Sequence, residues 1–137
     1  MSKTQIRVRG YHCDAYGHVN NARYLEFLEE ARWEFLQPAV DENFFNERNL
    51  IFVVAKINVE YKKPIVPNDL ITVNCDSIKF SNKSLVISQT IENSVTNTLC
   101  NRAEVSFVLL DSQSYKPTSI TSELIDKFNH LITLYNA

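Results

Sequence analysis

Glycine is scarce in this chain, since only two of its 137 residues are glycine. No apolar run approaches the length of a membrane-spanning helix, so we expect no membrane insertion. An excess of positive charge is also lacking, because the formal net charge is -2, which argues against nucleic acid as a partner. With 45% hydrophobic residues, a chain of this length suits one core, and we expect a single domain over residues 1–137.

Cysteine is rare and irregularly spaced. Cys13, Cys75 and Cys100 are odd in number, form no CxxC pair and follow no apolar signal segment. This pattern predicts reduced thiols in a cytoplasmic protein. His12 and His130 have no partner at metal-ligand spacing, so we expect no metal site and no cofactor.

Hydrophobic periodicity divides the chain into a strand, a long helix and a run of further strands. Residues 5–11 alternate apolar and polar side chains, which is typical of a half-buried strand. Residues 21–38 predict a helix with a wide apolar face, and Pro38 either ends this pattern or starts a short second helix through 41–48. Four β-rich segments separated by turn-like sequence come next, over 51–61, 70–80, 84–93 and 98–110.

The order of these elements indicates an α+β fold. The four β-rich segments predict an antiparallel meander, and about five strands in all form a curved sheet that wraps around one long central helix. Apolar residues spaced along 121–135 predict an amphipathic C-terminal helix.

The segment between the first strand and the long helix carries the strongest indication of chemistry. Asp14 follows the strand, Gly17 provides a free backbone conformation for a turn, and Asn20 or Asn21 can cap the helix. The unpaired N–H groups at such a helix start stabilise an anion, or an oxygen that gains negative charge during a reaction. Asp14 can also serve only as a cap of its own turn.

The sequence Asp-Ala-Tyr-Gly-His-Val-Asn-Asn-Ala-Arg-Tyr over 14–24, followed by Leu-Glu-Phe-Leu-Glu-Glu-Ala-Arg, resembles the 4-hydroxybenzoyl-CoA thioesterase family, whose members have the hotdog fold. Residues 59–64, Val-Glu-Tyr-Lys-Lys-Pro, and Asn68-Asp69 resemble the family's second strand and the turn after it. At the level of element order the resemblance covers the whole chain, although only the first motif is specific.

The resemblance implies an acyl-CoA thioesterase. Asp14 matches the aspartate that attacks the thioester carbonyl or activates the attacking water. Asn21 matches the residue whose backbone N–H polarises that carbonyl. Gly17 and Asn20 support the same turn, and Tyr24 either lines the acyl pocket or packs in the core.

His18 separates two kinds of thioesterase. The run from His18 to Asn21 also resembles plant-type acyl-carrier-protein thioesterases, which add an asparagine and a glutamate to the aspartate and histidine. Tyr16 and Pro64 stand at those two positions here, so the simpler aspartate mechanism fits better. His18 then shapes the pocket or hydrogen-bonds backbone.

The family also implies partners. We expect an acyl-CoA substrate and a homodimer or homotetramer with its sites between subunits. Lys62, Lys63 and Arg102 are candidates for charge pairing with the CoA phosphates. The alternatives are an acyl-carrier-protein thioesterase and a non-catalytic acyl-thioester-binding module of the same fold.

Overall fold

The computed structural model describes residues 2–136 as five strands and three α-helices. The strands are β1 (Ser2–Arg7), β2 (Leu50–Tyr61), β3 (Leu70–Phe80), β4 (Ser84–Asn93) and β5 (Leu99–Asp111). The helices are α1 (Asn21–Asp41), α2 (Phe44–Glu47) and α3 (Ser122–Asn136), with a 3-10 turn, η1 (Gly10–His12), after β1. The predicted element order is confirmed, with most boundaries within one or two residues.

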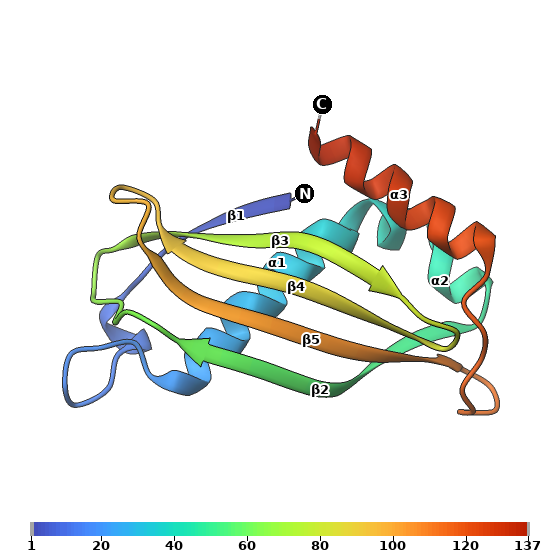
Figure 1. Ribbon diagram of the computed structural model, residues 1–137, viewed down its shortest axis with the longest axis horizontal. Helices are drawn as coiled ribbons and strands as arrows, with labels where there is room; N and C mark the ends of the chain where they lie inside the picture. The colour runs from blue at the N-terminus through green and yellow to red at the C-terminus, as the bar shows by residue number, and fades with distance from the viewer. Residues whose placement is uncertain (1, 137) are drawn as a thin grey trace.

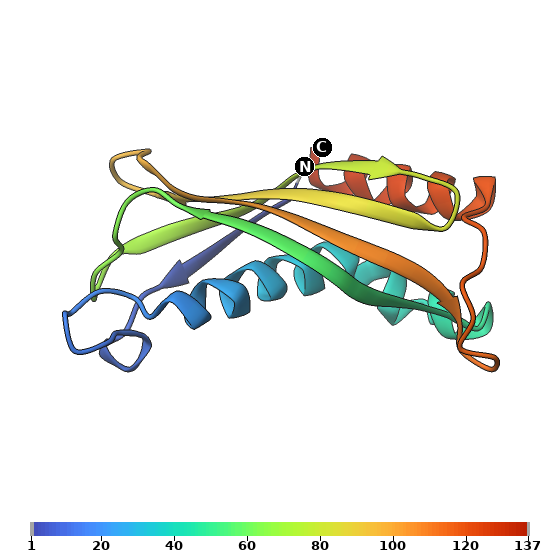
Figure 2. The ribbon, with the colours of Figure 1, turned by 60° about the horizontal axis from the view of Figure 1, so that its bottom comes forward.

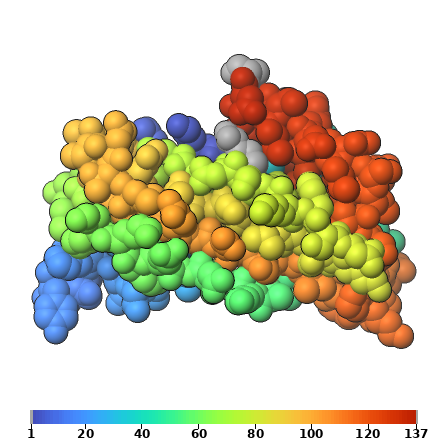
Figure 3. All heavy atoms as spheres, in the orientation of Figure 1, coloured from blue at the N-terminus to red at the C-terminus, as the bar shows by residue number. Residues whose placement is uncertain are grey.

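The five strands form one antiparallel sheet in the order β1-β3-β4-β5-β2. The sheet curves over α1, which crosses one of its faces (Figures 1 and 2). Alternate residues of β4 and β5, such as Ile87, Ile91 and Val105, are buried. In the view of Figure 3 the strands β2 to β5 form the surface, and α3 flanks the sheet at one end.

The expected meander holds for β3, β4 and β5 but is wrong for β2. This strand pairs with β5 along its length, from Leu50↔Asp111 to Tyr61↔Asn101, and lies at the opposite edge from β1. The physical reason is the connection over residues 62–69. It is too long for a tight hairpin, and it carries the chain from the β2 edge to the other side of the sheet, where β3 pairs with β1.

The first strand is shorter at its C-terminal end than predicted, because β1 stops at Arg7. Val8 still exchanges backbone hydrogen bonds with the turn before β3, to Asp69 and from Asn68, at 2.9 and 2.8 Å. The next N–H, that of Arg9, donates to Nδ1 of His12 at 2.9 Å. This local bond replaces a ladder bond and turns the chain into η1.

The long helix continues beyond the proline that was expected to end it, since α1 includes Pro38 and runs to Asp41. Proline has no N–H to donate to the carbonyl of Glu34, four residues earlier. The Tyr135 hydroxyl of α3 donates to that carbonyl instead, at 2.5 Å. Contact with α3 therefore satisfies the group that the proline leaves unpaired.

The aromatic part of the core joins α3 to the rest of the molecule. Phe128 of α3 is 2% exposed and packs against four rings, one each from α1, α2, β2 and β3. These are Phe35, Phe45, Phe52 and Phe80, with centroid distances of 5.6 to 6.3 Å. Within residues 2–136, no helix is both long and apolar enough to cross a membrane.

Candidate active site

The loop from Cys13 to Asn20 places the predicted site residues at the start of α1. Cys13 and Val19 form an antiparallel bridge, and the Val19 N–H donates to the Ile65 carbonyl at 2.8 Å. The N–H of Asn20 donates to the His12 carbonyl at 2.9 Å. These bonds tie the two ends of the loop to η1 and to the segment between β2 and β3.

Asp14 orders the loop with its own side chain. Its Oδ1 accepts hydrogen bonds from the N–H groups of Tyr16 and His18, at 2.9 and 3.4 Å. Gly17 has a φ of +75°, the left-handed conformation that glycine adopts without strain. Oδ2 of Asp14 has no hydrogen-bond partner among residues 2–136, and the side chain is exposed. One carboxylate oxygen therefore fixes the turn, while the other stays free.

The helix start is capped as the sequence predicts, and Asn20 is the cap. Its side-chain oxygen accepts from the Ala22 N–H at 2.9 Å, and its carbonyl accepts from the Arg23 N–H at the same distance. The N–H of Asn21 has no acceptor in the described part of the chain. A free amide thus remains at the positive end of the α1 dipole.

Tyr24 lies in the core, 4% exposed, with its ring edge-on to Tyr61 at 5.0 Å between centroids. Burial, above all, raises the pKa of Tyr24 to about 12, so its hydroxyl is neutral. The Tyr61 hydroxyl donates to the Asn21 carbonyl at 3.0 Å. The two tyrosines hold the first turn of α1 against the end of β2.

The remaining predicted groups lie at the surface. The side chain of His18 is exposed and has no hydrogen bond with residues 2–136, although its backbone pairs with Asp14. No group of three or more His, Cys, Asp or Glu side chains that could hold a metal occurs in residues 2–136. Lys62 pairs with Glu60 at 3.2 Å.

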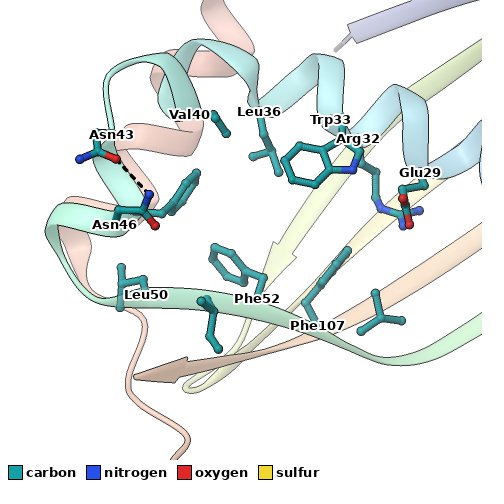
Figure 4. Close-up of a pocket in the computed structure, with 13 residues that line it drawn as sticks. Glu29, Arg32, Trp33, Leu36, Val40, Asn43, Asn46, Leu50, Phe52 and Phe107 are labelled. Carbon is teal, nitrogen blue, oxygen red and sulfur yellow. Dashed lines mark hydrogen bonds between the residues drawn. The ribbon is translucent and has the colours of Figure 1, made fainter. Parts of the chain in front are cut away.

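A groove of about 460 Å³ lies between α1 and the start of β2, closed at one end by α2 (Figure 4). Its lining is mostly apolar and aromatic: Trp33, Leu36, Val40, Phe45, Leu50, Ile51, Phe52, Val54 and Phe107, with Glu29, Arg32, Asn43 and Asn46. None of the six predicted site residues lines it. Such volume and lining are typical of a ligand pocket.

Comparison with known proteins decides the family. A model of the thioesterase-like superfamily matches residues 8–128. The chain belongs to the thioesterase-like superfamily. The resemblance found in residues 14–24 is thereby confirmed, as is the hotdog architecture.

Relatives in this superfamily cover nearly the whole chain. The long-chain acyl-CoA thioesterase FadM of Escherichia coli K12 is 40% identical over 95% of this chain and 98% of its own length. The acyl-CoA thioester hydrolase YbgC of Escherichia coli O6:H1 is 34% identical over 90% of this chain and 92% of its own. The crystal structure of YbaW, a probable thioesterase from Escherichia coli, has a TM-score of 0.88, at 40% identity over 95% of this chain and 98% of that one.

The sequence reasoning missed the groove because its lining comes from α1, α2, β2 and β5. One signal was visible. Arg32 follows Leu28 by four residues and precedes Phe35 by three, so it falls on the apolar face of the predicted helix. A charge at such a position is unusual unless it has a partner or a function.

Proposed function

We propose that this protein is an acyl-CoA thioesterase that hydrolyses an acyl-CoA to the free acid and CoA, with Asp14 and the Asn21 amide as its catalytic groups. The observation that carries the proposal is the Asp14 carboxylate itself. Its Oδ1 is held by two backbone N–H groups, which orients Oδ2 without occupying it. A preoriented, free carboxylate oxygen near a helix start suits a nucleophile or a general base.

The chemistry follows one of two routes. In the general-base route, Oδ2 of Asp14 takes a proton from water as the water oxygen adds to the thioester carbonyl, the C–S bond breaks, and the proton passes to the CoA thiolate. In the nucleophilic route, Oδ2 itself adds, the C–S bond breaks to release CoA, and water then opens the acyl-aspartyl anhydride to give the free acid. The Asn21 N–H, at the N-terminus of α1, donates to the carbonyl oxygen as it gains negative charge. A thiolate leaves without a strong general acid, so the Pro64 and Tyr16 positions need not carry acid–base groups.

The proposal includes assembly into at least a homodimer, through the β2 edge. β2 is an edge strand of twelve residues, and its Val53 and Val54 side chains are exposed. Trp33 of α1, which lies across the groove from β2 in Figure 4, is exposed as well. Unpaired edge groups beside apolar side chains favour strand pairing with a second copy, which would bring the groove of one subunit toward a loop of the other.

The cytoplasm is the compartment that we propose, because Cys13, Cys75 and Cys100 are all unpaired. We take CoA as the thiol carrier because the relatives FadM and YbgC are named as acyl-CoA hydrolases.

Changing Asp14→Asn tests the enzyme against a binding module. Asparagine keeps an oxygen for the turn and removes the charge, so binding should persist while kcat falls by roughly 10³-fold or more. Free-thiol release from a panel of acyl-CoAs measures turnover, and calorimetry measures binding.

Asp111→Asn is the matched control. Oδ1 of Asp111 accepts from the N–H groups of Gln113 and Ser114, both at 2.9 Å, so it has the same turn-forming role away from the loop. That variant should keep full turnover. A wild-type protein that binds acyl-CoA but hydrolyses none of the panel would instead support the non-catalytic module.

A further inference from the structure

Arg32 is the one buried cation in the groove, and its surroundings leave it incompletely paired. It is 7% exposed, and its Nη1 donates to Oε1 of Gln89 at 3.1 Å. No carboxylate of residues 2–136 lies within ion-pair distance of it. Its guanidinium carbon lies 5.5 Å from the centroid of the Phe107 ring. A buried charge with a single hydrogen bond is costly unless another group supplies the rest.

The other nitrogens of this guanidinium are not fully enclosed by residues 2–136. Four side-chain atoms in residues 2–136 are enclosed without a partner, namely Ser2 Oγ, Asn74 Oδ1 and both amide atoms of Asn101. Neither Nε nor Nη2 of Arg32 belongs to that set, although Gln89 engages only Nη1. Arg32 is among the residues that line the groove (Figure 4), so we take these two donors as accessible from it.

Gln89 holds the guanidinium in place. It is fully buried on β4, and its Nε2 donates to the Leu28 carbonyl of α1 at 3.0 Å and to Sγ of Cys75 at 3.5 Å. Both contacts use the amide nitrogen, so the amide oxygen must point toward Arg32. The donors of Arg32 are therefore preorganised, which lowers the entropy lost when a ligand binds them.

Glu29 determines which kind of ligand suits these donors. It lies one turn before Arg32 and lines the same groove. Burial lowers the pKa of Arg32, and the charge of Glu29 opposes that effect. Glu29 and Arg32 give the groove lining one negative and one positive charge, so the lining is nearly neutral overall. A neutral ligand oxygen therefore suits the groove better than a carboxylate.

We propose that Arg32, positioned by Gln89, is a specificity-determining residue that favours acyl groups carrying a hydroxyl or keto oxygen on the chain. The inference rests on the proposed function, because it takes the groove as the site of the acyl group. An unsubstituted acyl chain would displace water from these two charged donors without forming a hydrogen bond to them. A chain with a suitably placed oxygen replaces that water, and sites built around such donors discriminate strongly against analogues that lack the oxygen.

Binding of matched acyl-CoAs tests this independently of turnover. The probes are hexadecanoyl-CoA and hydroxyhexadecanoyl-CoAs with the hydroxyl near the thioester, at mid-chain or at the terminal carbon. Calorimetry on the Asp14→Asn variant should give, for one hydroxylated isomer, a dissociation constant about 10- to 100-fold lower than that of hexadecanoyl-CoA. This is the range expected for a hydrogen bond to a charged group. Equal affinity for all four probes would overturn the inference.

Substitution of Arg32 shows whether that residue is the cause. Arg32→Met in the same background should abolish the preference and bind hexadecanoyl-CoA as well as before or better. Arg32→Lys, which keeps the charge without the planar fork, should retain part of it. Lys79→Met removes an exposed positive charge from β3 and should change nothing. If Arg32→Met folds and still prefers the hydroxylated acyl-CoA, Arg32 is not the selecting group. The same conclusion holds if only Arg32→Lys folds and it keeps the full preference.

Three further outcomes separate the proposed function, this inference and a role of Arg32 in assembly. A wild-type protein that hydrolyses every probe equally, with no effect of Arg32→Met, leaves the thioesterase function intact and removes this inference. A hydroxyl preference without any hydrolysis leaves the inference intact and removes the function. If Arg32→Met instead dissociates the oligomer in light scattering, the free donors bind the partner subunit and the inference is wrong.

Discussion

At the residue scale, the capping role of Asp14 is observed, and its catalytic role is the one that we propose. Its Oδ1 caps the turn that contains Gly17, and its Oδ2 remains available for chemistry. His18 is different, because only its backbone takes part in the turn. The side chain is exposed and has no hydrogen bond with residues 2–136, so none of these residues pairs with it as an acid–base partner.

His18→Ala should therefore reduce kcat by on the order of tenfold or less, whereas loss of a true general base costs roughly 10²- to 10⁴-fold. Steady-state hydrolysis of acyl-CoA measures the effect. His130→Ala, at an exposed position of α3, is the control and should have no effect. A large loss in a variant of unchanged melting temperature would favour the acid–base mechanism of the carrier-protein enzymes.

At the element scale, α3 stabilises α1 as well as the end of the sheet. The Tyr135 hydroxyl satisfies the α1 carbonyl that Pro38 leaves free, and Phe128 fills the space between the rings of α1, α2, β2 and β3. The Arg48 side chain pairs with Glu123 at the start of α3, at 2.8 Å. Because that ion pair is exposed, we expect most of the stabilisation to come from Phe128.

Phe128→Ala should lower the free energy of unfolding by about 3 to 5 kcal/mol, the range for a fully buried phenylalanine. Denaturant titration followed by circular dichroism measures this loss. Leu134→Ala, on the same helix but 47% exposed, should change it by about 0.5 kcal/mol or less. Equal effects of the two changes would mean that α3 is not anchored through its buried face.

At the scale of the whole molecule, the site loop and the groove lie in different parts of one chain. Asp14 and Asn21 stand at the N-terminal end of α1, and the groove follows the later turns of that helix. The exposed β2 edge runs along the groove, so pairing of two such edges is the arrangement that we propose to complete the site.

Val53→Lys tests that assembly, because a charge on an edge strand opposes pairing with another strand. We expect the wild-type protein to be a dimer or tetramer at micromolar concentration in light scattering, and the variant to shift toward monomer with loss of turnover. Val95→Lys places the same charge at an apolar side chain that is 81% exposed in the turn after β4, and should alter neither property. A stable, fully active wild-type monomer would contradict the shared site.

Much of this protein is determined by local sequence. The alternation in β3, β4 and β5 and the spacing of apolar residues in α3 placed those elements within one or two residues, because period and turn chemistry act over short distances. The same holds for the turn at Gly17 and the cap at Asn20, whose bonds close within the loop.

Contacts between distant segments decided the rest. The edge position of β2 depends on its pairing with β5. The α1 carbonyl that Pro38 leaves free finds its donor in Tyr135, and the groove exists only where α1, α2, β2 and β5 meet. Gln89 and Arg32 are 57 residues apart, and neither predicts the other from local pattern. Packing brings them together, since a buried polar group has to find its partner wherever the fold supplies one.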